Sequence, residues 1–358
     1  MSKLQVQPVA RKVTAISWLP PRAGTAYTDT DLYFVTGSGA KHKELVLWTT
    51  PNPDFAQSEP DSTNDLATVV SKVPHNGDVQ GIIALSPGLL ATASSTGIIS
   101  VYNMDTESGS MEFSESVTAH KFSNGEVAGA TSLAVQPTGA LDVEVASCGE
   151  DGRIAFTALS QLKESQGYDV DSTVITDLCW TTPTQLAITT RGGQIKIFDR
   201  RMPSEILAAF ANSQSSQALE SIAVHPSQPF RLATGTAGGS VLVWDIRDMR
   251  QPVIEELAVH EANVWQVRFD PADSTRVISC SEDASIAVTQ WATEGKGAVA
   301  LGVAPPERGV RRLSSMFNAL SINCFDICPS TRTHLLVAGS DSGNLLMEKT
   351  VNPDFKLF

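Results

Sequence analysis

The sequence is poor in the residues on which most catalytic and metal sites depend. Of its 358 residues only 18% are charged and 6% aromatic, and it has five cysteines and six histidines. The cysteines show no paired spacing, and the histidines are scattered singly, without the H-E-x-x-H or C-x-x-C pairs typical of metal sites. The sequence therefore indicates neither a disulfide framework nor a metal centre, and we expect no cofactor and no small-molecule substrate.

Long apolar runs and an N-terminal signal are also missing. No uncharged apolar stretch approaches the ~18 residues that a membrane span needs, and the opening MSKLQVQPVARK has no apolar h-region. Basic residues are few, 26 Lys and Arg against 39 Asp and Glu, for a formal net charge of −13. Such a surface repels phosphate backbones. We expect a soluble protein of the cytosol or nucleus, with no membrane insertion and no direct contact with nucleic acid.

The chain contains an internal repeat. VASCGEDGRIAF at 145–156 nearly recurs as VISCSEDASIAV at 277–288, an offset of 132 residues, or three times 44. Seven such segments align, each with short apolar runs separated by Gly, Pro, Ser, Asp or Asn. A period of about 40 to 45 residues with four strands per unit is typical of a β-propeller blade. We expect an all-β, seven-bladed propeller over residues 1–358, with blades near 13–48, 78–102, 128–157, 172–198, 218–244, 262–291 and 321–349.

The seventh copy ends after three strands, near Lys349. A propeller closes into a ring only when its last blade is complete, and an unpaired strand edge invites aggregation. Residues 4–10, LQVQPVA, are a spare strand ahead of the first blade. We therefore expect the amino-terminal strand to be the outer strand of blade seven and to close the ring.

Polar residues recur at fixed places in the repeat and indicate a structural network. In blade six His260 precedes the first strand, Ser279 lies on the second and Asp283 follows it in the hairpin. In blade three the hairpin holds Asp151 and Gly152. An Asp at this position can accept backbone N–H groups of the turn, and glycine supplies the backbone conformation that the turn needs. We expect these residues to stabilise the blades rather than to carry chemistry.

The run VLVWD ends on Trp244 and Asp245 and resembles the signature of the WD-repeat family. Blades of that family often carry a buried His, Ser, Asp and Trp hydrogen-bond network, which the resemblance implies here too. His75 and His120 also precede first strands, so we expect them to be network members. Cys148 and Cys280 hold equivalent repeat positions, which favours small buried apolar side chains over nucleophiles.

An insertion at 294–321 separates blades six and seven and combines two unusual features. Four apolar residues fall at i, i+3, i+4 and i+7, which predicts one face of a helix, and three arginines form a basic cluster in an acidic protein. The residues concerned are Leu313, Met316, Phe317 and Leu320, with Arg308, Arg311 and Arg312. Two interpretations stay open: the helix packs on its own propeller, or it docks into a groove of a partner.

Trp265 is a second candidate for partner binding. In HEANVWQVRF, strict alternation places Trp265, Val267 and Phe269 on one face of the first strand of blade six. Core packing is the interpretation that the burial habits of tryptophan favour. The alternative is that Trp265, near the strand start, reaches the surface as an aromatic anchor.

Several segments together resemble the family of forty-three-kilodalton WD-repeat nucleoporins, from the Y-shaped, outer-ring scaffold subcomplex of the nuclear pore. They are VPHNGDVQ, ASSTGIISVY, CGEDGRI, GGQIKIFDRR, ATGTAGGSVLVWDIRD and VHEANVWQVRFDP. The resemblance implies a non-catalytic scaffold nucleoporin of the nuclear envelope that supports pore assembly and transport of protein and mRNA. Its implied partners are helical scaffold nucleoporins of the short arm and a neighbouring propeller nucleoporin.

A second function class remains open, because propellers also serve as peptide-capturing adaptors. Such an adaptor would be a ubiquitin-ligase substrate receptor, a chromatin reader or a peroxisomal targeting receptor. Nothing in the sequence indicates an enzyme in either case.

Overall fold

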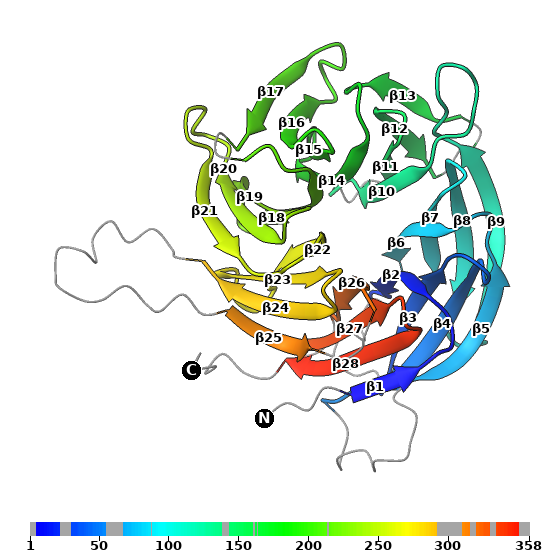
Figure 1. Ribbon diagram of the computed structural model, residues 1–358. Helices are drawn as coiled ribbons and strands as arrows, with labels where there is room; N and C mark the ends of the chain where they lie inside the picture. The colour runs from blue at the N-terminus through cyan, green and yellow to red at the C-terminus, as the bar shows by residue number, and fades with distance from the viewer. Residues whose placement is uncertain are drawn as a thin grey trace, which may run out of the picture.

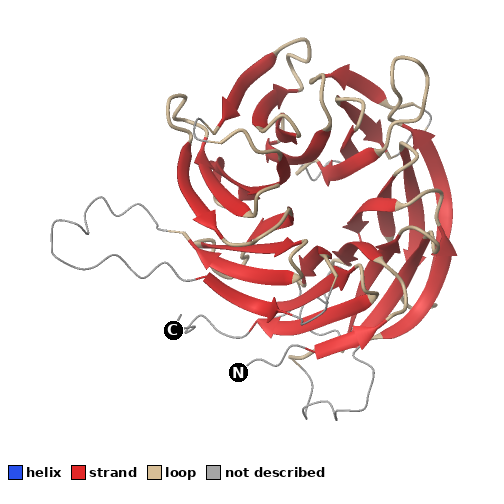
Figure 2. Ribbon diagram, in the orientation of Figure 1, coloured by secondary structure: helices blue, strands red, loops and turns tan. Residues whose placement is uncertain are grey.

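The computed structural model describes residues 5–21, 30–54, 67–86, 88–137, 143–159, 162, 164–212, 215–291, 310–315, 320–329 and 334–350. Within these ranges the chain forms seven four-stranded antiparallel sheets, arranged as the blades of a ring (Figure 1). All the regular elements described are strands (Figure 2). The expected fold, an all-β seven-bladed propeller, is confirmed.

Blades one to three follow one another along the chain, each from its inner to its outer strand. Blade one comprises β2 (Val13–Trp18), β3 (Asp31–Ser38), β4 (Glu44–Pro51) and β5 (Thr68–Pro74). Blade two comprises β6 (Val79–Ser86), β7 (Leu89–Ser94), β8 (Ile98–Asp105) and β9 (Ser110–Thr118). Blade three comprises β10 (Ala130–Val135), β11 (Glu144–Gly149), β12 (Arg153–Ala158) and β13 (Gln166–Asp169).

Blades four to six repeat this order. Blade four comprises β14 (Ile175–Thr182), β15 (Gln185–Thr190), β16 (Gln194–Asp199) and β17 (Ile206–Ala211). Blade five comprises β18 (Leu219–His225), β19 (Gln228–Thr236), β20 (Ser240–Asp245) and β21 (Val253–Ala258). Blade six comprises β22 (Val264–Phe269), β23 (Arg276–Ser281), β24 (Ser285–Gln290) and β25 (Val310–Ser315).

Blade seven draws its strands from both ends of the chain. Its inner three are β26 (Ile322–Ile327), β27 (His334–Ser340) and β28 (Asn344–Thr350), and its outer strand is β1 (Gln5–Pro8). β1 pairs antiparallel with β28 from Gln5 opposite Met347 to Pro8 opposite Asn344. The amino-terminal strand therefore closes the ring, as the three-stranded seventh copy predicted.

The core lies between neighbouring sheets, because the second and third strands of each blade are buried on both faces. These strands read as nearly continuous apolar runs, such as LLATAS in β7 and SVLVWD in β20. Where the first and last blades meet, Val13 and Phe34 of blade one pack in one cluster with Cys324 and Val337 of blade seven. The ring is thus sealed by apolar packing as well as by the β1–β28 ladder.

The helix predicted from the spacing of Leu313, Met316, Phe317 and Leu320 is wrong over residues 313–315, which belong to strand β25 (Val310–Ser315), and residues 316–319 lie outside the described part. β25 pairs antiparallel with β24, from Thr289 opposite Val310 to Ser285 opposite Ser315. Pairing with β24 outweighs the local helical pattern. Without β25, the backbone N–H and C=O groups on the outer edge of β24 would have no hydrogen-bond partner in the sheet. The outer strand of blade six therefore comes from the segment that the sequence assigned to an insertion.

Candidate functional site

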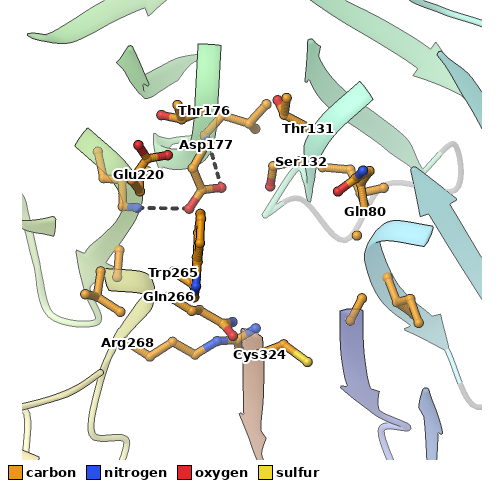
Figure 3. Close-up of a pocket in the computed structure, with 18 of the residues that line it drawn as sticks. Gln80, Thr131, Ser132, Thr176, Asp177, Glu220, Trp265, Gln266, Arg268 and Cys324 are labelled. Atoms are coloured by element: carbon orange, nitrogen blue, oxygen red, sulfur yellow. Dashed lines mark hydrogen bonds between the residues drawn. The ribbon is translucent and has the colours of Figure 1, made fainter. Parts of the chain in front are cut away.

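The inner strands of all seven blades surround a central channel with a cavity volume of about 440 Å³. Figure 3 shows its wall, with Asp177, Glu220, Trp265 and Arg268 among the labelled side chains. Because every blade contributes one strand, the channel is the point where all the repeats meet.

Each inner strand carries a β-bulge at its second residue, so that this residue has no direct partner on the next strand. The seven bulged residues are Thr14, Gln80, Thr131, Thr176, Glu220, Trp265 and Asn323. A bulge changes the direction of a side chain relative to strict alternation. All seven line the channel.

Three of the bulged side chains donate a hydrogen bond to a backbone carbonyl of the next blade. Thr131 Oγ1 donates to the carbonyl of Ile175, and Thr176 Oγ1 donates to the carbonyl of Leu219, both at 2.6 Å. Asn323 Nδ2 donates to the carbonyl of Val13 at 2.9 Å. These bonds give backbone carbonyls of the neighbouring inner strand a hydrogen-bond donor, so part of the polar lining is structural.

Trp265 lies in the channel wall, and its assignment to the core is wrong. The bulge between Val264 and Gln266 breaks the expected alternation, so that Val264, Val267 and Phe269 are buried while Trp265 is 37% exposed. Trp265 Nε1 donates to Ser321 Oγ at 2.9 Å. The indole ring is therefore held in place with part of its surface open to the channel.

Two carboxyl groups near Trp265 lie in environments that disfavour their charge. Burial raises the pKa of Asp177, although the carboxylate accepts backbone N–H groups of Leu178 and Ile222 at 2.8 and 2.9 Å. Burial also raises the pKa of Glu220, and the Arg191 guanidinium opposes this shift. Because Ile222 belongs to blade five, Asp177 ties blade four to its neighbour.

The thiol groups of the channel wall and blade cores are poor nucleophiles. Burial raises the pKa of Cys324 in the channel wall and of Cys148, Cys179 and Cys280. A protonated thiol does not attack carbonyl or disulfide groups. Among the described residues, no group of three or more His, Cys, Asp or Glu side chains is placed to hold a metal ion.

The structure brings His260, Ser279 and Asp283 of blade six together. His260 Nε2 lies 2.8 Å from Ser279 Oγ, and its Nδ1 lies 3.2 Å from an Asp283 carboxylate oxygen and 2.8 Å from Ser285 Oγ. Asp283 also accepts the backbone N–H groups of Glu261 and Ser285. The Asp283 carboxylate thus connects the residue that precedes the first strand, the hairpin and the His260 imidazole.

Blade three holds the same arrangement around Asp151. His120 Nδ1 lies 3.0 Å from an Asp151 oxygen, and its Nε2 lies 2.9 Å from Ser147 Oγ. Asp151 accepts the backbone N–H groups of Lys121 and Arg153, and Gly152 has a φ of +70°. The geometry supports a structural role for these residues, as proposed from the repeat.

The WD dipeptide of blade five is buried, with Trp244 Nε1 donating to Thr234 Oγ1 at 2.9 Å. Asp245 accepts hydrogen bonds from the backbone and side chain of Arg247, which hold the pKa of its carboxyl below the usual value. Sequence reasoning missed a matching pair in blade one, where Trp48 Nε1 donates to Thr36 Oγ1 at 2.8 Å. A Thr on the second strand, followed across the hairpin by a Trp on the third strand, is the sequence pattern that would have predicted this pair.

The remaining candidate residues belong to the insertion. Arg311, Arg312 and Leu313 lie on β25, where Leu313 occupies a bulge between the partners of Ile286 and Ala287. Leu320 is 59% exposed. The other three, Arg308, Met316 and Phe317, lie outside the described residues.

The described part of the chain has no helix long and apolar enough to cross a membrane.

Comparisons with known proteins agree with the repeat and the ring. The family model for the N-terminal domain of Nucleolar protein 10-like proteins, a β-propeller domain, matches residues 175–347. Nucleoporin Nup43 of Homo sapiens is 26% identical over 295 residues, covering 80% of this chain and 75% of the relative, and Nup43 of Mus musculus is 26% identical over 291 residues with the same coverage. Nuclear pore complex protein NUP43 of Arabidopsis thaliana is 24% identical over 176 residues, 42% of this chain and 49% of that protein. The chain is therefore similar in sequence to the Nup43 nucleoporins, and its structure is a seven-bladed β-propeller.

Proposed function

We propose that this chain is a non-catalytic scaffold subunit of the nuclear pore complex at the nuclear envelope. The observation that carries the proposal is the similarity to Nup43, which covers 80% of the chain in two mammals and recurs in a plant and in Dictyostelium discoideum. The structure is compatible with it, because the channel polar groups bond mainly to neighbouring blades and the thiols in its wall and around it are held protonated.

Within the pore, the proposed place is the Y-shaped subcomplex. Its direct partners there would be helical scaffold nucleoporins of the short arm and a neighbouring propeller. The sequence resemblance supports this finer assignment, and a role in pore assembly and in transport of protein and mRNA would follow from it.

A basic contact on blade six is part of this proposal. Arg311 and Arg312 lie on the outer strand of a protein with a net charge of −13. An acidic surface of a helical partner would complement them. The full candidate set for this contact is Arg308, Arg311, Arg312, Leu313, Met316, Phe317 and Leu320, with Trp265 as a separate anchor in the channel.

The test is to tag the chain in cells of its source organism, to image it and to purify its complexes from nuclear envelopes. We expect a nuclear-rim signal and stoichiometric recovery with scaffold nucleoporins. Recovery with ubiquitin-ligase subunits, histones or peroxisomal import factors in place of nucleoporins would replace the scaffold by the adaptor alternative.

The basic contact has its own test, the double substitution Arg311→Glu and Arg312→Glu. We expect it to weaken association with the scaffold at least about tenfold while the melting temperature of the free chain changes little, because a charge that serves an interface stabilises only the complex. Replacing Lys72, a basic residue on the outer strand of blade one, by Glu is the matched control. Unchanged association of the double variant would place docking elsewhere.

A further inference from the structure

The seven outer strands differ in how they protect their free edges. Soluble proteins block exposed strand edges with charged residues or proline, because a free row of N–H and C=O groups would otherwise pair with another chain. Six of the seven described outer strands carry such a residue: Pro8 on β1, Lys72 and Pro74 on β5, Glu112 and Glu115 on β9, Asp169 on β13, Glu255 and Glu256 on β21, and Arg311 and Arg312 on β25.

Strand β17 of blade four is the exception. Its six residues, ILAAFA, include no charged or polar residue and no proline. Among the described strands it pairs only with β16, and its other edge lies on the outside of the ring (Figure 1). The side chains on its exposed face are Leu207, which is 42% exposed, Ala209 and Ala211. A six-residue apolar edge of this kind is unprotected against strand addition.

Carboxylates flank this edge at both ends. Glu205 is exposed and directly precedes the strand. At the other end Asn212 donates to a Glu256 carboxylate oxygen at 3.4 Å, and a groove of about 260 Å³ lies between the end of β17 and the start of β21. Six residues of strand span roughly 20 Å, so that the two negative ends are about that far apart.

The geometry points to β17 as a docking edge for an extended segment of a partner protein, about six residues long, apolar at alternate positions and with Lys or Arg at each end. Main-chain hydrogen bonds to the free edge would supply affinity, and the basic ends would meet Glu205 and Glu256. This inference goes beyond the proposed function, since it concerns the chemistry of the segment and not the complex to which the segment belongs.

A second copy of this chain fits the edge poorly. Antiparallel pairing of two β17 strands would place Glu205 of each copy near the Glu256 end of the other, and both copies are strongly acidic. Like charges opposed across a strand pair are destabilising. Charge complementarity therefore favours a basic segment of a different protein.

The first test uses a photo-crosslinking amino acid, p-benzoylphenylalanine, at position 209 of the full chain in intact complexes purified from cells. Position 69 on β5 is the matched control, because Val69 is an exposed apolar residue, 45% exposed, on a protected outer strand. We expect position 209, but not position 69, to crosslink to a segment with alternating apolar residues and basic ends. A crosslink to a second copy, to a segment without this composition, or no crosslink in the assembled complex would overturn the inference.

The second test compares Leu207→Lys with Leu207→Glu and with Val69→Lys. Both substitutions at 207 remove an apolar contact, and lysine also repels the basic ends of the segment. We expect Leu207→Lys to weaken binding of the crosslinked partner about tenfold or more, Leu207→Glu less, and Val69→Lys not at all, with unchanged melting temperatures of the free variants. Equal binding by all three would overturn the inference. The nuclear-rim signal of the unmodified chain is read separately, so that failure of the proposed function and failure of the docking edge are distinguished.

Discussion

Blades three and six, whose second and third strands are near-copies in sequence, hold the same contacts around the hairpin between those two strands. In both, a buried histidine bridges a serine on the second strand and an aspartate in the following hairpin. Their outer strands have nothing in common: β13 is a four-residue strand, QGYD, whereas β25 is VRRLSS and follows residues 292–309, which lie outside the described part.

The difference shows where sequence is constrained in a propeller. The hairpins between the second and third strands of these two blades have the same backbone groups to satisfy, so the polar network recurs. An outer strand has only to pair with one neighbour, and its other edge is open to solvent, so its side chains are free to differ. We therefore expect the residues that distinguish one propeller from another to lie on the outer strands, and the residues that determine folding to lie in these hairpins.

The largest expected effect concerns blade seven, where a rim strand is also a folding determinant. Deleting residues 1–10 would remove the β1–β28 ladder and the two hydrogen bonds between the Gln7 side chain and the backbone of Ala67. We expect the free energy of unfolding to fall by several kcal/mol, since a whole strand loses its burial and pairing.

Gln7→Ala is the control for this deletion, because it removes only the bonds to blade one and keeps the strand. It should cost about 1 to 3 kcal/mol. Chemical denaturation of the purified chains measures both values. An unchanged denaturation midpoint in the deletion variant would show that the amino-terminal strand does not hold the ring closed.

The second-largest expected effect is a pair of opposite changes in the free energy of unfolding, one in the hairpin of blade three and one in the matching hairpin of blade six. Gly152 and Ala284 occupy equivalent positions, with φ values of +70° and +64°. A Cβ at 152 would collide with the carbonyl oxygen of Asp171. We expect Gly152→Ala to cost about 2 kcal/mol or more, and Ala284→Gly to stabilise the chain by about 0.5 to 1 kcal/mol, because alanine is strained in the left-handed region.

Thermal and urea unfolding of the two variants measure these opposite signs. Destabilisation by both substitutions, or by neither, would mean that the hairpins differ in a way the backbone angles do not capture.

A smaller and symmetric effect is expected at the two aspartates. Asp151→Ala and Asp283→Ala each leave hairpin N–H groups without their acceptor and should each cost about 1 to 3 kcal/mol. The blades are well separated, so the double variant should show the sum of the two losses. Neither substitution should selectively weaken partner binding. If the Asp283→Ala variant kept its full stability but lost partner binding, Asp283 would be a binding residue and not a member of the structural network.

The sequence was a good guide to features that repeat. Turn residues at fixed offsets revealed seven copies, and the short seventh copy predicted ring closure by the amino-terminal strand. The hydrogen bonds of His260 and Asp283 could be expected for the same reason. Each of these features depends on contacts within one repeat or on a simple strand count.

The sequence was a poor guide to features that depend on a neighbouring element. The bulge that turns Trp265 toward the channel occurs in all seven inner strands, but it breaks the alternation from which a side-chain direction is inferred. Leu313 and Leu320 do have the spacing of a helical face, but residues 310–315 form a strand because they pair with the outer edge of β24. The unprotected β17 edge became visible only when the outer strands could be compared with one another.

The smallest expected effect is the pH dependence of stability that arises from buried histidines. Burial lowers the pKa of His75, whose Nδ1 and Nε2 lie 2.9 Å from the carbonyl of Gly77 and 3.0 Å from Thr92 Oγ1, and burial with the nearby Arg231 charge lowers that of His225. The unfolded chain then binds more protons than the folded one below the usual histidine pKa of about 6.5, so the free energy of unfolding should fall as the pH drops through and below that value. Blades three and six hold their histidines in hydrogen-bond distance of an aspartate, whereas the ring nitrogens of His75 lie beside a carbonyl and a hydroxyl. The Gly77 carbonyl and the Asp78 charge oppose the effect of burial on the pKa of His75 without cancelling it. His75→Asn should therefore flatten the pH profile between pH 7.5 and 5.5. Urea unfolding at intervals across this range measures the slope, and a His75→Asn variant with the slope of the parent chain would show that His75 is not a source of the pH dependence.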